Sequence, residues 1–293
     1  MTIPPDRGHV ATEQVQQITA QLDLLSIQEC VDLLATDHRQ AIQAVEIASD
    51  SIATFIDAVF ERRGRLIYIG CGTSGRLGVL DAAECPPTFQ SDPEMIVGLI
   101  AGGDTSLRTS SEAKEDDPSG AHDALTQLSL TDQDTVLGIA AGGTTPWVLG
   151  GIQFAKEQGA MTGFLTCSSS DVVVDHLICL ETGPEPLTGS TRLKAGTATK
   201  LTLNIITTTL FTKLGKVYGN LMVDLKATNN KLMDRAIRIV SSICEVDRSH
   251  AFAILKDADG DVKIAVVMHQ RSLSKDEAHN RLDAANGNLR ASL

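Results

Sequence analysis

Five apolar runs alternate with helix-like segments in the middle of the chain. They lie at residues 65–70, 95–100, 135–141, 162–167 and 176–181. Each run is continuously hydrophobic rather than alternating, which is typical of parallel strands buried on both faces. Because helical segments separate the runs, we predict a three-layer α/β/α sandwich around a five-stranded parallel sheet.

Helices are predicted on both sides of this sheet. A short one covers "SIQECVDLLATD", and a long one covers residues 37–63, where apolar positions recur at helical spacing and Gly64 follows as the end signal. Another long helix begins near Thr197. Four short helix-like segments then make up the tail: "MDRAIRIVSSIC", "SHAFAILKDA", "VKIAVVMHQ" and "SKDEAHNRLDAA".

The pattern divides the chain into three parts. Residues 1–54 form an N-terminal helical segment, residues 55–225 the α/β domain, and residues 226–293 a small C-terminal helical subdomain. A chain of 293 residues with 42% hydrophobic residues can bury a substantial core.

Charge and composition narrow the ligand classes. A formal net charge of −12 argues against a long nucleic-acid surface, yet a local pocket of backbone N–H groups can still bind a small phosphorylated ligand. The six cysteines form no C-x-x-C pair and the seven histidines are dispersed, so we expect no metal site. With no signal-peptide or membrane-span pattern, we expect a soluble cytoplasmic protein with reduced thiols.

A glycine-rich turn follows the first apolar run. Gly70, Gly72 and Gly75 give the spacing G-x-G-x-x-G, which suits a dinucleotide site, a sugar-phosphate site or a turn without a ligand. The acidic residue expected about 20 positions further on in a dinucleotide site is missing. Thr73 and Ser74 at the centre of the turn carry hydroxyls, so we favour a phosphate at the helix N-terminus.

Longer motifs carry a family resemblance. The segment "GCGTSGRLGVLDAAECPPTF" resembles the signature of the N-acetylmuramic acid 6-phosphate etherases, within the sugar isomerase (SIS) domain superfamily. The blocks "GLIAGG", "EAKEDD", "GPEPLTGSTRLKAGTATKLTLN" and "LGKVYGNLMVDLKATNNKL" follow in the family's order. The resemblance implies a lyase that releases D-lactate from N-acetylmuramate 6-phosphate by elimination and hydration, without a metal or an organic cofactor.

The resemblance places the catalytic acid and base at Glu84 and Glu115. We expect Pro86 and Pro87 to stop the helix directly after Glu84. A carboxylate at a helix C-terminus faces the unfavourable end of the dipole, which suits a proton donor. We therefore assign Glu84 as the acid toward the lactyl oxygen and Glu115 as the base at C2, although the acidic run around Glu115 also fits a solvated surface.

The expected substrate contacts come from three turns. The turn at 140–147 departs from the Ser-Gly-Arg-Thr-Pro form that the family usually has, which leaves its phosphate contacts open. Residues before the long helix either cap it or bind the ligand, and a lysine there supplies a cation, with Arg76 and Arg192 as alternatives. The predicted contacts are Gly72, Thr73, Ser74, Gly143, Thr144, Thr145, Ser190, Thr191 and Lys194.

Two other functions share these features. An aldose–ketose phosphosugar isomerase also needs a phosphate site at a sheet edge and a carboxylate base. A non-catalytic sugar-phosphate-binding regulator, similar to the glucokinase regulatory protein, would bind the sugar and release no lactate. The resemblance further implies a homodimer, with a role in either cell-wall recycling or scavenging of muramate.

Overall fold

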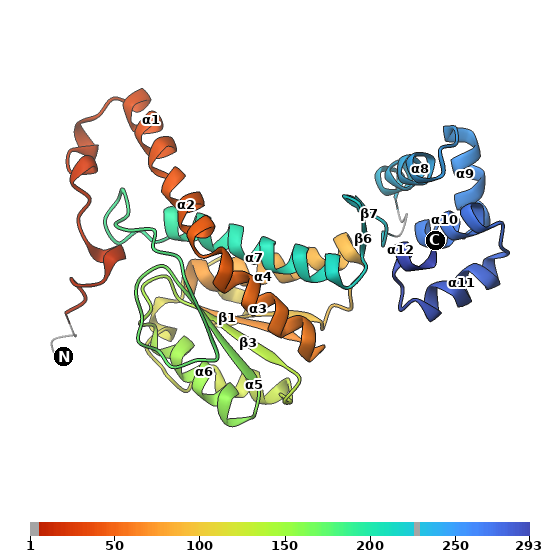
Figure 1. The fold of residues 1–293 in the computed structure, drawn as a ribbon. Coiled ribbons are helices and arrows are strands. Elements are labelled where there is room, and N and C mark those ends of the chain that lie inside the picture. The colour runs from red at the N-terminus through yellow and green to blue at the C-terminus, as the bar shows by residue number, and fades with distance from the viewer. Residues whose placement is uncertain (1–5, 226–228) are drawn as a thin grey trace. The chain divides into compact units, whose positions relative to one another are not determined.

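A five-stranded parallel sheet lies at the centre of the fold (Figure 1). The computed structural model describes residues 6–225 and 229–293. The strand order is β2-β1-β3-β4-β5, with all neighbours parallel. The strands are β1 (Leu66–Gly70), β2 (Ile96–Ile100), β3 (Thr135–Ile139), β4 (Met161–Thr166) and β5 (His176–Cys179). All five predicted strands and the predicted fold class are confirmed.

The order of the strands determines where a ligand can bind. β1 pairs with β2 on one side and with β3 on the other. The strand order therefore reverses between β1 and β3, because the chain passes from β1 to β2 on one side and then returns to β3 on the other. In open parallel sheets, the crevice outside the carboxyl ends of such strands is the usual binding site.

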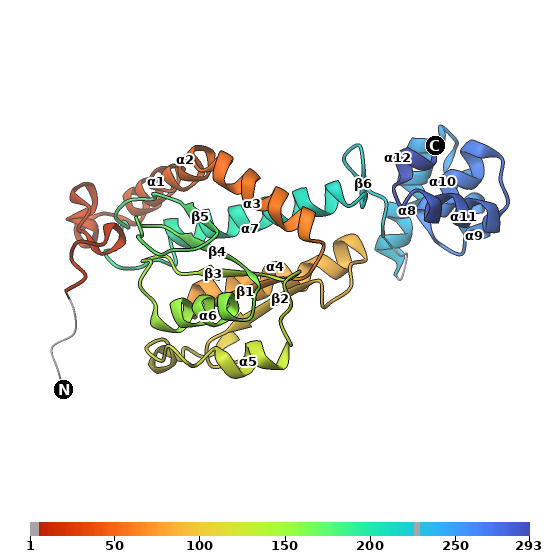
Figure 2. The same ribbon diagram turned by 60° about the horizontal axis from the view of Figure 1, so that its bottom comes forward.

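Helices cover both faces of the sheet (Figure 2). α6 (Pro146–Glu157) packs on one face, where a Cβ on Gly138 of β3 would come within 2.4 Å of the Ile152 side chain. α3 (Ser49–Arg62) lies against the other face, where Gly163 of β4 meets the Phe55 ring. These glycines have no side chain because the helices approach the strands too closely to admit one. The other helices around the sheet are α5 (His122–Gln127), α4 (Gly72–Phe89) and α7 (Lys194–Lys213).

The prediction of one continuous helix over residues 37–63 is wrong. The structure has two helices there, α2 (Arg39–Ile47) and α3, which meet at Ala48, and α1 (Ile27–Asp37) precedes them. Arg63 takes the left-handed conformation that ends α3, with φ of 62°. Gly64 is required for a different reason, because a Cβ there would lie 2.1 Å from the Gln133 carbonyl oxygen.

The expectation that two prolines stop α4 is also wrong, because the helix continues through Pro86 and Pro87 to Phe89. The missing N–H groups remove two hydrogen bonds but do not break the helix. Phe89 is buried and stacks on Phe211, with ring centroids 4.5 Å apart. This packing favours the continued helix, which ends where Gln90 takes a φ of 48°.

The chain forms two compact units. The first comprises Met1–Ala83 and Glu94–Ile206, and the second Glu84–Pro93 and Thr207–Leu293. The division at 1–54, 55–225 and 226–293 stays a prediction, because compactness alone does not define domains. The second unit contains α8 (Asn230–Cys244), α9 (Arg248–Asp257), α10 (Val262–Arg271), α11 (Lys275–Ala284), α12 (Leu289–Ser292) and a hairpin of β6 (Val217–Tyr218) and β7 (Leu221–Met222).

The four helical segments predicted in the tail correspond to α8–α11. α10 is the most buried of them, since all residues from Val262 to Val267 are buried and, apart from Lys263, belong to the apolar core of this unit. Polar side chains cap the backbone N–H groups at the start of each helix. The caps are Asn229, Asp247, Asp261, Ser274 and Asn288.

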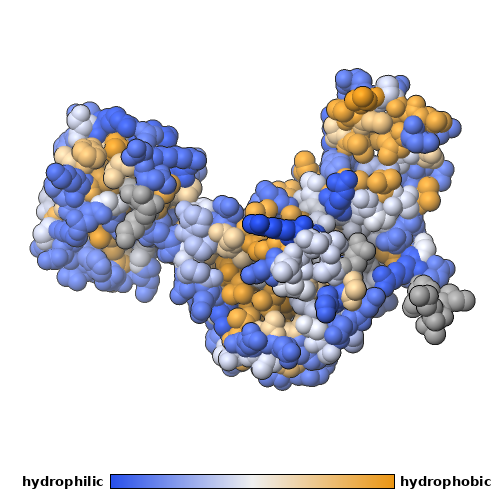
Figure 3. Space-filling model, turned by 180° about the vertical axis from the view of Figure 1, so that it is seen from behind, coloured by the Kyte–Doolittle hydropathy of each residue, from blue (hydrophilic) through white to orange (hydrophobic). Residues whose placement is uncertain are grey.

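Apolar side chains gather on the surface of the N-terminal helices, at the upper right of Figure 3. Ile27 in α1 is 87% exposed and Ile47 in α2 is 76% exposed. Exposed apolar groups of this kind are common in protein–protein contacts. Within the described part of the chain, none of the helices combines the length and apolar character needed to cross a bilayer.

Candidate active site

A polar pocket of about 400 Å³ opens in the first unit, beside the carboxyl ends of β1 and β3. The start of α4, the loop after β3, the loop before α7 and the N-terminal segment form its wall. The lining residues are Arg7, Val10, Glu13, Cys71, Gly72, Thr73, Ser74, Arg76, Ser110, Glu115, Ile139, Ala140, Ala141, Gly142, Thr144, Thr145, Gly189 and Thr191.

The glycines after β1 allow the strand and the helix to pack closely. A Cβ on Gly70 would lie 2.7 Å from the Gly75 nitrogen, and one on Gly75 would lie 2.5 Å from the Gly70 carbonyl oxygen. Gly72 has a φ of 51°, a left-handed conformation that favours glycine. α4 begins at Gly72, so its first backbone N–H groups and the residues Thr73 and Ser74 belong to the pocket wall.

Glu115 lies against this helix start. Its Oε1 atom is 3.3 Å from the position that a Cβ on Gly72 would take. The Glu115 carbonyl oxygen accepts a hydrogen bond of 3.0 Å from the backbone N–H of Trp147, which attaches the loop to the start of α6. Trp147 is buried in the core. The pocket therefore contains a carboxylate held beside a helix N-terminus.

The neighbouring thiol is not ionised. Burial, and then the charge of Glu115, raise the pKa of Cys71 to about 12. A thiol with this pKa stays protonated at neutral pH, and a protonated thiol is a poor nucleophile. Among the described residues, no group of three or more His, Cys, Asp or Glu side chains is arranged to hold a metal ion.

The loop after β3 brings two threonines to the pocket. Gly143 turns the chain with a φ of 75°, and its N–H donates to the Ala140 carbonyl at 2.9 Å. Gly143 itself does not line the pocket, but the next two residues, Thr144 and Thr145, do. Thr145 precedes α6 without a side-chain capping bond. The Thr145 hydroxyl is therefore not used to cap this helix.

The loop before α7 contributes Gly189 and Thr191, whereas Ser190 does not line the pocket. The Thr191 carbonyl oxygen accepts a hydrogen bond of 2.9 Å from the Gly196 backbone N–H, but the side chains of Ser190 and Thr191 do not cap α7. Instead the buried carboxylate of Glu185 accepts hydrogen bonds of 2.9 Å from the backbone N–H groups of Lys194 and Ala195. Burial raises the pKa of Glu185, and these two bonds oppose the rise.

Besides Gly143 and Ser190, two further predicted site residues, Lys194 and Glu84, do not line the pocket. Lys194 is fully buried, and its Nζ donates to Asp37 Oδ1 at 3.2 Å and to Gln40 Oε1 at 2.7 Å. This ammonium group thus connects α7 to the N-terminal helices. Glu84 is exposed on α4 and does not line the pocket. Glu84 lies five residues before the end of α4, outside the last turn, so it is not at the negative end of the helix dipole as expected.

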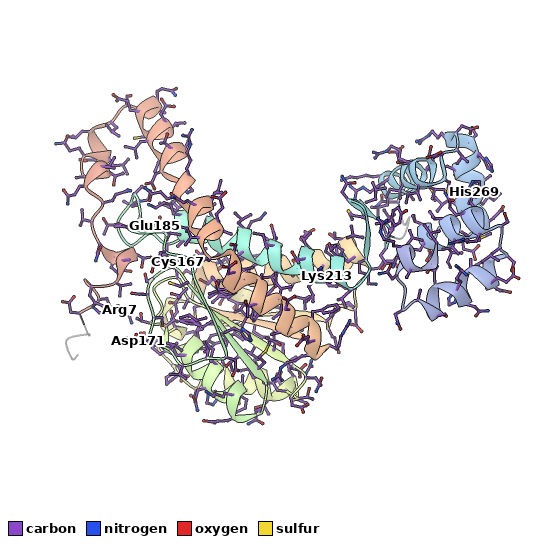
Figure 4. All side chains as sticks on the ribbon, in the orientation of Figure 1. Arg7, Cys167, Asp171, Glu185, Lys213 and His269 are labelled. Atoms are coloured by element: carbon purple, nitrogen blue, oxygen red, sulfur yellow. The ribbon has the colours of Figure 1, made fainter. Side chains whose placement is uncertain are left out.

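The prediction from sequence missed the N-terminal segment altogether. Arg7, Val10 and Glu13 line the pocket, and Figure 4 shows Arg7 on the side of the sheet where Cys167 follows β4. The only signal in the sequence is the mixed charge of "DRGHVATE", which is equally typical of a solvated terminus. Arg76 on α4, considered as an alternative cation, also lines the pocket.

The five-stranded parallel sheet with helices on both faces is the SIS fold. Residues 47–156 match the glucokinase regulatory protein N-terminal SIS domain, and residues 219–263 match the C-terminal lid domain of glucokinase regulatory protein. A solved protein of Bacteroides fragilis NCTC 9343, described as a phosphosugar isomerase involved in capsule formation, has the same fold. Its TM-score is 0.50 at 17% identity, over 67% of this chain and 95% of that one.

Sequence relatives identify the family. An N-acetylmuramic acid 6-phosphate etherase of Synechococcus is 49% identical over 98% of this chain and 93% of its own length. One of Trichormus variabilis is 50% identical over 97% of this chain and 95% of its own length. The chain belongs to the N-acetylmuramic acid 6-phosphate etherase family.

Proposed function

We propose that this protein cleaves the ether between D-lactate and C3 of N-acetylmuramate 6-phosphate, giving N-acetylglucosamine 6-phosphate and D-lactate. Family membership supports the overall reaction. The observation that carries the site is the Glu115 carboxylate, whose Oε1 atom lies 3.3 Å from the Cβ position of Gly72 at the start of α4. There it can serve as a base next to a group of phosphate-binding donors.

The phosphate is expected at the N-terminus of α4. Unpaired N–H groups and the positive end of the helix dipole favour an anion there. The hydroxyls of the pocket wall add donors, and Gly143 and Ser190 shape the loops that carry them. The proposed contacts are Gly72, Thr73, Ser74, Thr144, Thr145 and Thr191. The buried ion pair of Lys194 leaves Arg76 as the better cation for this group.

The reaction proceeds by elimination and then hydration. In the open-chain aldehyde, Glu115 removes the C2 proton, the C3–O bond breaks, and an acid protonates the departing lactate oxygen. This leaves a double bond between C2 and C3, conjugated with the aldehyde. Water then adds at C3 and a proton returns to C2. Atoms and electrons balance without a metal or an organic cofactor.

We assign the acid to Glu84 of a second copy of the chain. Glu84 lies twelve residues beyond Gly72 on the same helix, which corresponds to about 18 Å along the axis. A glutamate side chain spans only roughly 5 Å. The acid and the base act on adjacent sugar carbons and must each be within hydrogen-bond reach of them. Glu84 of the same copy would not reach a substrate bound beside Gly72, so a homodimer with shared sites fits the two-glutamate mechanism better.

Release of D-lactate from N-acetylmuramate 6-phosphate tests the proposal. We expect turnover by the unaltered protein, and its loss in Glu115→Ala and Glu84→Ala with the fold intact by circular dichroism. Near-normal turnover in either variant would remove that residue from the mechanism. Binding of the sugar phosphate without lactate release would favour a regulator. Interconversion of fructose 6-phosphate and its aldose isomer would favour an isomerase.

The reaction also suggests where the protein works. Its substrate is a phosphorylated cell-wall sugar, and phosphorylated sugars are retained inside cells. We therefore propose a cytoplasmic enzyme that recycles or scavenges muramate. Partition of the activity between cytoplasmic and membrane fractions tests this location.

A further inference from the structure

The N-terminal segment forms one wall of the active-site pocket. Val10 is 7% exposed and Thr12 is fully buried. Both lie against the loop after β3, where a Cβ on Gly142 would be 3.8 Å from Val10 Cγ1 and 3.7 Å from Thr12 Oγ1. These two residues attach the segment to the sheet domain. The charged residues on either side of them, Arg7 and Glu13, line the pocket.

Arg7 is available to a ligand. Its side chain is exposed, and among the described residues no hydrogen bond or ion pair engages its guanidinium group. The other cation of the pocket wall, Arg76, follows four residues after Gly72 on α4 and donates from Nε to the Leu107 carbonyl at 3.3 Å. The two cations therefore belong to different walls, one at the start of α4 and one on the N-terminal segment.

The proposed substrate carries two anionic groups, a phosphate at C6 and a lactyl carboxylate at C3. The helix N-terminus, the hydroxyls and Arg76 already suit the phosphate. Resting on the proposed function, we infer that Arg7 binds the lactyl carboxylate. A guanidinium group can pair with a carboxylate through two parallel hydrogen bonds, which makes arginine well suited to this role. The N-terminal segment then distinguishes a muramic acid from other amino-sugar phosphates.

Comparison of two ligands tests this assignment. N-acetylglucosamine 6-phosphate has the phosphate but lacks the lactyl group. We expect Arg7→Ala to raise KM for N-acetylmuramate 6-phosphate roughly tenfold to a hundredfold, as loss of a hydrogen bond to a charged group does. Inhibition by N-acetylglucosamine 6-phosphate should keep its Ki. The KM of Arg7→Lys should lie between those of the unaltered protein and Arg7→Ala, because lysine keeps the charge but not the paired hydrogen bonds.

The matched control is Arg39→Ala, because Arg39 is exposed on α2 outside the pocket. Three results decide whether Arg7 binds the lactyl carboxylate. A parallel rise of KM and Ki in Arg7→Ala would place Arg7 on the phosphate and overturn the inference. No change in either constant would also overturn it. If the unaltered protein releases no lactate, this result contradicts the proposed function but does not test the role of Arg7. Calorimetric binding of the same two sugars would then still show whether Arg7 discriminates between them.

Discussion

Mixed dimers offer the sharpest test of where the catalytic acid comes from. Two variants are needed, Glu84→Gln and Glu115→Gln, each of which removes one proposed proton-transfer group with little change in side-chain volume. The helix between Gly72 and Glu84 is about 18 Å long, so the acid and the base of one site belong to different copies in our proposal. Each variant alone should then be inactive at both of its sites.

A dimer of one Glu84→Gln copy and one Glu115→Gln copy behaves differently. With two-fold symmetry, one of its sites carries both substitutions and the other carries neither. We therefore expect about half the kcat of the unaltered dimer, with an unchanged KM. If the acid and the base came from the same copy, each site would carry one substitution, and the mixed dimer would stay inactive.

The experiment needs co-expression of the two variants with different affinity tags, so that sequential purification isolates the mixed dimer. D-lactate release is then measured per dimer against an unaltered dimer with the same two tags. Activity no higher than that of either single variant would refute the shared site. A monomeric protein in light scattering that is still active would refute it as well.

Two stability predictions follow from buried carboxylates. Burial by itself raises the pKa of Asp134, but hydrogen bonds from Arg65 and Thr131 lower this pKa from 3.8 to about 2. The lowered pKa corresponds to about 2 kcal/mol of stabilisation of the folded state. This stabilisation is present above pH 3.8 and is lost as the pH falls toward 2. In urea unfolding, the loss of unfolding free energy caused by Asp134→Asn should therefore become smaller as the pH falls over this range. A loss that is constant with pH would contradict the lowered pKa of Asp134. Glu185→Ala removes two hydrogen bonds at the start of α7, so we expect a loss of about 1–3 kcal/mol in unfolding free energy. Glu46→Ala, an exposed control on α2, should cost little, and an equal loss in both variants would count against the capping role.

The sheet could be predicted from the sequence because its signal is local. Each strand is a short apolar run bounded by turn residues, and the helices between the strands require parallel pairing. The tail helices were predictable for a similar reason, since each segment has its own apolar spacing. The break at Ala48 was missed because the apolar positions on its two sides have compatible helical spacing, and no glycine or proline in the sequence marks the boundary between α2 and α3.

Contacts between distant residues could not be predicted. Lys194 was expected to bind substrate, yet it is paired with Asp37, which lies 157 positions away in the chain. The prolines of α4 were expected to end the helix, yet Phe89 packs on Phe211. In each case a tertiary contact outweighs the local preference. The N-terminal wall of the pocket was missed for the same reason, because Arg7 and Glu13 join the site only when the chain folds back on the sheet.

The charge of the pocket differs from the charge of the whole chain, and Cys71 helps to explain how a base can work there. The chain is strongly acidic, whereas the pocket wall carries two arginines, Arg7 and Arg76, and two glutamates, Glu13 and Glu115, beside a helix N-terminus. A thiolate at Cys71 would add a second negative charge beside Glu115 and compete with it for the C2 proton. Because burial and the charge of Glu115 hold the pKa of Cys71 at about 12, the thiol stays neutral. In the proposed mechanism, Cys71 therefore adds no negative charge beside the Glu115 carboxylate and does not compete with it for the C2 proton.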